Sequence, residues 1–152
     1  MSAIYSPPMP LISATSLRIR SFSFLPAFGF HAMRANGQLR GAVGFKAGAF
    51  LPDRHRTFWT LSCWERAEDM RAYMKTGPHR TAMPKLMEWC DEASVVNWEQ
   101  DGPTLPDWFE ADRRMRLEGR PSKVRCPTPD HLGMTFAPPR ELRVAAASPR
   151  PR

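Results

Sequence analysis

The stretch Thr57-Phe-Trp-Thr-Leu-Ser-Cys-Trp64 decides the fold, because it is the clearest β-strand in the chain. Alternate residues of a strand point to opposite faces of its sheet, so Phe58 and Trp64 share one face while Trp59 and Leu61 share the other. Both faces therefore carry large apolar side chains. We expect helices to cover one face of the sheet and a second sheet, supplied by a partner subunit, to cover the other.

The segments on either side of this strand predict the order strand, helix, strand, strand, helix, strand. The other expected elements are a strand over 17–24, a helix over 26–37, a strand over 41–45, helical stretches over 65–75 and 79–92, a strand over 93–98 and a charged helix over 106–119. Two β-α-β halves within about 100 residues describe a ferredoxin-like βαββαβ α+β sandwich with an extra C-terminal helix. Burial of both sheet faces makes this a prediction of a homodimeric α+β barrel.

The length of 152 residues, with 42% hydrophobic and 24% charged residues, fits one domain. Charge and proline gather at the ends: residues 120–152 hold seven basic and two acidic residues, hence +5 of the net charge of +7, and seven of the 16 prolines. Segments rich in proline and poor in aromatic residues cannot bury enough apolar surface to offset the entropy of ordering. We therefore expect a domain over 16–119, with disordered segments over 1–15 and 120–152.

Several functional classes lack the sequence features that they need. Three cysteines without a C-x-x-C pair argue against a disulfide scaffold or a zinc site and favour a reducing compartment. The first 15 residues contain no Lys or Arg, and no apolar stretch is long enough to span a bilayer, so we expect a cytoplasmic protein with no membrane partner. The basic tail lies apart from the aromatic residues, which argues against nucleic-acid binding. Motifs for nucleotide, zinc-protease and serine-hydrolase chemistry do not occur.

Three stretches resemble the antibiotic-biosynthesis-monooxygenase-like domains: the aromatic strand at 58–64, Met70-Arg-Ala-Tyr73, and Thr76-Gly-Pro-His-Arg-Thr-Ala-Met-Pro84. The resemblance covers residues 17–108 and is nearest to an uncharacterised bacterial branch of that superfamily. It implies a dimeric α+β barrel with a pocket between each sheet and its helices. Members of the superfamily include cofactor-free oxygenases of aromatic substrates, haem-degrading enzymes and domains without known activity.

The resemblance carries over to individual residues only in part. In the haem-degrading relatives a Trp at the end of the third strand lines the pocket, and Trp64 matches it. Their haem-ligating His falls on Met83 here, while His79 stands one turn earlier. Their pocket Asn on the first strand has no counterpart over 17–24. These departures count against haem degradation by that set of residues, and the cofactor stays open between none and haem.

Two histidines are candidates for chemistry. His79 follows Gly77 and Pro78 at an expected helix start, where a neutral imidazole suits a general base or an iron ligand, or simply bonds the backbone. His31 lies beside Phe28 on the apolar side of the first helix, as a pocket residue or a core residue does. The predicted site has no metal ligands; it consists of the catalytic candidates His79 and His31 and the lining residues Phe28, Trp59, Trp64, Tyr73, Arg80 and Met83.

Two functions follow from these features. The first is a monooxygenase-like domain, cofactor-independent or haem-dependent, that holds a small aromatic or polyene substrate between sheet and helices. The alternative is a non-catalytic dimeric domain that binds a small apolar ligand or stabilises an assembly. If His31 and His79 share one cavity the first gains support; if they lie apart, the second does.

Overall fold

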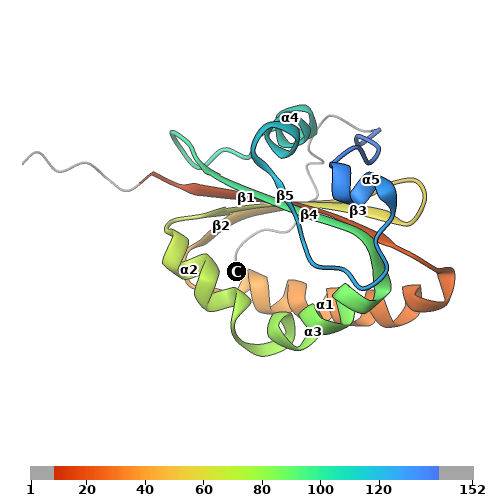
Figure 1. Ribbon diagram of the computed structural model, residues 1–152. Coiled ribbons are helices and arrows are strands. Elements are labelled where there is room, and N and C mark those ends of the chain that lie inside the picture. The colour runs from red at the N-terminus through yellow and green to blue at the C-terminus, as the bar shows by residue number, and fades with distance from the viewer. Residues whose placement is uncertain (1–8, 141–152) are drawn as a thin grey trace, which may run out of the picture.

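The computed structural model describes residues 9–140 as an antiparallel sheet with helices on both faces (Figure 1). Its strand order is β2-β3-β1-β4-β5. The elements in chain order are β1 (Leu11–Ile19), η1 (Phe22–Phe24), α1 (Leu25–Arg40), β2 (Phe45–Pro52), β3 (Thr57–Trp64), α2 (Ala67–Met74), α3 (Gly77–Trp89), β4 (Cys90–Glu99), α4 (Trp108–Glu118), β5 (Arg120–Pro121) and α5 (Pro129–Gly133). The predicted ferredoxin-like α+β order is therefore confirmed, with α2 and α3 together in the place of the second helix.

The strand at the centre of the prediction has its predicted bounds, whereas the first two strands differ. β1 begins at Leu11 rather than at residue 17, because Ser and Thr residues in its first half hide the strand pattern. Residues 22–24 form a short 3-10 helix instead, started by the Ser21 side chain, which accepts a hydrogen bond from the Ser23 backbone N–H. β2 begins at Phe45, since the chain turns at Gly44 with a φ of +82° that favours glycine.

Helices α1, α2 and α3 lie against one face of the sheet, and α4 and α5 lie against the other (Figure 1). On the α4 side, Trp108 and Met115 are fully buried against β-strand residues that include Trp59 and Leu61. Full burial of a side chain of this size contributes about 1.5–3 kcal/mol. Within the described chain, α4 and the segment after it cover this face, where we expected a partner's sheet. No helix within residues 9–140 has the length and apolar character needed to cross a membrane.

The chain beyond α4 is part of the domain as far as the structure describes it, to Arg140. His131 is 2% exposed; its Nδ1 accepts a hydrogen bond from the Ala93 backbone N–H at 3.1 Å, and its Nε2 donates to the Ser122 carbonyl at 2.8 Å. Farther along, the Arg140 guanidinium bonds the Asp53 carboxylate at 2.7 Å. The predicted boundaries at residues 16 and 119 thus move outward, since these polar bonds and the burial of Phe136 in the core hold the segment. The remainder of the two predicted disordered ends, residues 1–8 and 141–152, lies outside the described residues.

Candidate functional site

The face of the sheet toward α1 and α3 carries two apolar clusters with polar side chains between them. One cluster centres on Trp64 and Phe45, and the other on Ile19 and Phe28. The strand register places five polar residues between the clusters and on the same face as Trp64; this polar belt comprises Ser13, Thr15, Thr60, Ser62 and Asn97. All five are half-buried although helices lie over this face.

Hydrogen bonds within the belt leave the side chains of Ser13 and Asn97 without a partner among the described residues. The hydroxyls of Thr15 and Thr60 bond each other, and the Trp64 indole N–H donates to the Ser62 hydroxyl at 2.9 Å. The Asn97 side-chain oxygen is buried and has no hydrogen-bond partner among the described residues. A buried acceptor of this kind costs free energy unless a water or a ligand donates to it. The belt therefore presents hydroxyl and amide groups on the face of the sheet toward α1 and α3.

A stack of aromatic rings leads from this belt to His79. The ring of Trp64 lies 5.6 Å from that of Phe45 and 5.4 Å from that of Tyr73, and the Tyr73 ring lies 4.8 Å from the imidazole of His79. Burial raises the pKa of Tyr73, so its phenol stays protonated and donates to the Ala35 carbonyl on α1 at 3.2 Å. These contacts bring together three of the predicted site residues, Trp64, Tyr73 and His79.

Gln38 of α1 fixes the position of His79 at the start of α3. Its side-chain oxygen accepts from the His79 backbone N–H at 2.8 Å, while its nitrogen donates to the carbonyls of Tyr73 and Thr76 at 3.1 and 2.8 Å. One amide thus joins α1 to the end of α2 and to the start of α3. The sequence analysis missed this residue, because a glutamine in an expected loop carries no pattern of its own.

The environment of His79 favours the neutral imidazole. Burial lowers its pKa below the ordinary 6.5, and the Met74 carbonyl, 3.3 Å from Nδ1, opposes that effect only in part. If this contact holds the proton on Nδ1, Nε2 carries the lone pair. Nε2 has no hydrogen bond to a described residue, so it is the atom available to accept a proton.

His31 belongs to a separate group of aromatic rings. Its imidazole lies 5.3 Å from the ring of Phe30 and 5.7 Å from that of Trp89, at the far end of α3. His31 and Gln38 are seven residues apart on α1, which corresponds to about 10 Å along the helix. No ring contact or hydrogen bond within residues 9–140 joins His31 to His79 or its stack.

The remaining predicted site residues lie in four different environments. Trp59 points to the α4 side of the sheet, where its ring lies 6.2 Å from that of Phe136. It therefore cannot line a site with Trp64 on the opposite face, which is covered by α1 and α3. Phe28 is buried against Phe58 at 4.7 Å, in the second apolar cluster. Arg80 is exposed, and Met83 is half-buried on α3.

Neither of the two hollows described below is lined by His79 or His31, so these hollows do not place haem on either histidine. The His79 ring lies against Tyr73, and His31 lies between Phe30 and Trp89. A ligand of drug size or larger occupies a cleft of about 300–1,000 Å³ that encloses most of its surface. Within residues 9–140, no group of three or more His, Cys, Asp or Glu side chains is arranged to hold a metal ion.

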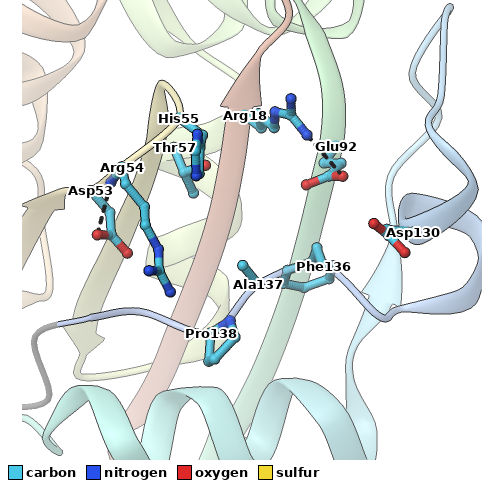
Figure 2. Close-up of a pocket in the computed structure, with 10 residues that line it drawn as sticks. All are labelled: Arg18, Asp53, Arg54, His55, Thr57, Glu92, Asp130, Phe136, Ala137 and Pro138. Carbon is cyan, nitrogen blue, oxygen red and sulfur yellow. Dashed lines mark hydrogen bonds and ion pairs between the residues drawn. The ribbon is translucent and has the colours of Figure 1, made fainter.

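The described part of the chain has two hollows, and the larger one adjoins the candidate site. One, of about 300 Å³, opens at the junction of α1 and α2 beside Gln38 and Tyr73. The other, of about 100 Å³, lies at the end of the sheet between the β2–β3 turn and the C-terminal segment (Figure 2). Its charged groups are largely paired: Arg18 lies 3.5 Å from Glu92, and bonds from Arg140 hold the pKa of Asp53 below its ordinary value although burial alone would raise it. The paired charges around this second hollow therefore hold the C-terminal segment against the β2–β3 turn.

The fold is shared with solved structures of known description. A putative antibiotic biosynthesis monooxygenase from Nitrosomonas europaea aligns with a TM-score of 0.56 and 15% identity over 67% of this chain and 100% of its own. SnoaB, a cofactor-independent oxygenase from Streptomyces nogalater solved as a point mutant, aligns with a TM-score of 0.52 and 12% identity. The alignment covers 64% of this chain and 97% of SnoaB. A dimeric ferredoxin-like protein of unknown function from Thermobifida fusca aligns with a TM-score of 0.51 and 17% identity. The alignment covers 66% of this chain and 99% of that protein.

The chain has the fold of the antibiotic-biosynthesis-monooxygenase-like proteins. No family model and no curated protein matches the sequence. The structural alignments establish the monooxygenase-like, ferredoxin-like fold, and at such low identities they leave the reaction to be argued from the site.

Proposed function

We propose that this protein is a cofactor-independent oxygenase-like domain that binds a small aromatic substrate between the sheet and helices α1 and α3. The observation that carries the proposal is the half-buried polar belt, which interrupts the apolar layer on this side and lies next to the Trp64–Tyr73–His79 stack. A fully structural interface would place apolar residues there, since buried polar groups cost free energy unless they are paired. The structural neighbour described as a cofactor-independent oxygenase has this fold.

In this proposal the substrate lies against the rings of Trp64 and Tyr73 and donates a hydrogen bond to the side-chain oxygen of Asn97. The substrate class is a hydroxylated aromatic with an acidic CH₂ group, because its own electrons can reduce dioxygen. Nε2 of His79 takes one proton from that carbon, and the carbanion adds O₂ to give a peroxide anion. The imidazolium returns the proton, and loss of water leaves a carbonyl, so CH₂ and O₂ become C=O and H₂O.

The test uses 1,8-dihydroxyanthrone as a probe and follows oxygen uptake and formation of the quinone. We expect turnover by the wild-type protein and its loss, by about 10²-fold or more, in His79→Gln, because general-base catalysis contributes about that much. His55→Gln is the matched control, since His55 is an exposed residue of the β2–β3 turn. Equal turnover in wild type and His79→Gln would remove His79 from the mechanism.

The separation of His31 from His79 favours the second candidate, a non-catalytic domain that binds an apolar ligand. It predicts that the probe quenches tryptophan fluorescence in a saturable way without oxygen uptake. Asn97→Leu should then weaken binding, because the substitution removes a buried acceptor that is unpaired among the described residues. This outcome would keep the binding site and discard the reaction.

A homodimer stays a prediction, supported by the dimeric description of one structural neighbour. Because α4 and the segment after it cover the second face of the sheet, a second copy would contact the outer side of α4. Phe109 and Leu117, 58% and 69% exposed, lie there about two helical turns apart. Light scattering on the wild type and on Phe109→Ser/Leu117→Ser tests this contact. A cytoplasmic location also stays a prediction, consistent with three unpaired cysteines.

A further inference from the structure

Helix α1 has apolar residues on its solvent side as well as on its inner side. Phe28 and Ala32 pack inward, in the apolar cluster beneath the helix. Pro26, Phe30 and Met33 follow the spacing i, i+4, i+7 and are all exposed, with Phe30 at 57% and Met33 at 78%. We call these three residues the outer α1 stripe. A surface helix normally has polar residues on this side, so the stripe suits a partner.

The surface around this stripe is basic. α1 contains two arginines and no acidic residue, and α3, which lies beside it, contains Arg80 and Lys85 with Glu88 as its one acid. Glu88 is 3.3 Å from the guanidinium of Arg20 and 2.8 Å from that of Arg125, which offset its charge. The outer faces of α1 and α3 therefore attract an anionic surface.

Arginines lie directly over exposed aromatic rings at this surface. Phe22, 71% exposed just before α1, has the Arg56 guanidinium 4.7 Å from its ring centre, and Phe30 has that of Arg34 at 5.7 Å. Each pair therefore combines an exposed ring with a cation. α2, which has two acidic residues and one arginine, contacts the opposite end of α1, near Gln38.

We propose that the outer faces of α1 and α3 form a peripheral docking surface for an anionic lipid bilayer. Phe22, Phe30 and Met33 enter the boundary between headgroups and acyl chains, and the surrounding arginines contact lipid phosphates. A bilayer fits better than a nucleic acid, because a flexible aliphatic side chain such as Met33 adds burial in lipid and does not stack on a base. The sequence analysis predicted no membrane partner from the lack of a spanning segment, and peripheral docking needs none. The inference does not depend on the proposed reaction.

Co-sedimentation with vesicles tests the docking surface on the full chain. We expect the wild type to bind vesicles that contain phosphatidylglycerol, to bind pure phosphatidylcholine vesicles at least about tenfold more weakly, and to lose binding as salt is added. Phe30→Ser/Met33→Ser and Arg34→Gln/Arg80→Gln should each reduce partitioning by about tenfold or more. Leu132→Ser is the control; Leu132 is 69% exposed on α5, on the other side of the sheet, so its substitution should leave binding unchanged.

The substituted residues are exposed, so thermal unfolding should show that each variant keeps its fold. The inference is overturned if the wild type does not bind the anionic vesicles, or if the Phe30/Met33 variant binds them as well as the wild type does. It is also overturned if a single-stranded RNA competes for the surface and Phe30→Ser/Met33→Ser does not change the RNA affinity. That result would assign the basic face to a nucleic acid.

Discussion

Replacing His131 by alanine should release the C-terminal segment from the sheet and destabilise the whole domain. The substitution removes the 2.8 Å bond to Ser122 and leaves the Ala93 backbone N–H, now bonded to Nδ1 at 3.1 Å, without a partner. Ala93 is 1% exposed, and an orphaned buried donor costs about 1–3 kcal/mol. Loss of a ring that is only 2% exposed leaves a cavity that adds about 1–2 kcal/mol. We therefore expect His131→Ala to lower the free energy of unfolding by about 2–5 kcal/mol.

Urea unfolding followed by tryptophan fluorescence measures this difference, and trypsin cleavage after Arg125 reports release of the segment itself. Leu132→Ala on the same helix is the control; Leu132 is 69% exposed, so its loss should change stability by less than about 0.5 kcal/mol. We expect faster cleavage in His131→Ala and unchanged cleavage in Leu132→Ala. A loss below about 1 kcal/mol for His131→Ala would refute the reasoning, because one orphaned donor alone costs that much.

Three further predictions concern the turn before β2, the histidine of the site and the thiols. Gly44→Ala should destabilise more than Gly102→Ala in thermal unfolding: both glycines have a positive φ, but a Cβ at Gly44 would overlap the Asp69 carboxylate on α2, whereas one at Gly102 meets nothing within 4 Å. Burial lowers the pKa of His79 in the folded state, so the unfolded state binds more protons as the pH falls through about 6.5. The free energy of unfolding of the wild type relative to His79→Gln should therefore decrease over this range. A difference between the two proteins that does not change with pH would contradict this prediction. Iodoacetamide should modify exposed Cys126 in the native protein and leave Cys90, whose pKa burial raises to about 12, unmodified until unfolding, as mass spectrometry can show.

The sequence predicted the elements with strong periodic patterns and missed those held by individual polar contacts. β3, with large residues on both faces, has its predicted bounds, and α4 was expected from its charged, amphipathic pattern. β1 was placed too late because Ser13 and Thr15 replace the apolar residues that mark a buried strand. The tail was assigned to disorder from its prolines, whereas His131 and Arg140 hold it through specific bonds that composition cannot reveal.

The candidate site was predictable where its residues lie on neighbouring elements. Trp64, Tyr73 and His79 follow one another along β3, α2 and α3, so short connections bring them together. Gln38 and Asn97 come from distant parts of the chain. The packing of α1 against α3 brings Gln38 to His79, and the pairing of β4 with β1 places Asn97 opposite Ser13 of the belt. Trp59 was assigned to the site by residue type, although the strand alternation already separates it from Trp64.

The contrast between the two faces of β1 gives the strongest physical argument for a binding site on the helix side. Ile12 and Ala14 point toward α4 and are fully buried, while Ser13 and Thr15 point toward α1 and α3 and are half-buried. The contrast holds at these four positions, since the α4 side also buries the hydroxyls of Ser16 and Ser94 and leaves the Trp59 indole nitrogen without a partner among the described residues. Apolar residues would be more stable on the helix side as well, because polar groups there lose water without full pairing. Local departures from the most stable choice concentrate at functional sites. The α4 side is therefore the structural core, and the polar belt is where a ligand should be sought.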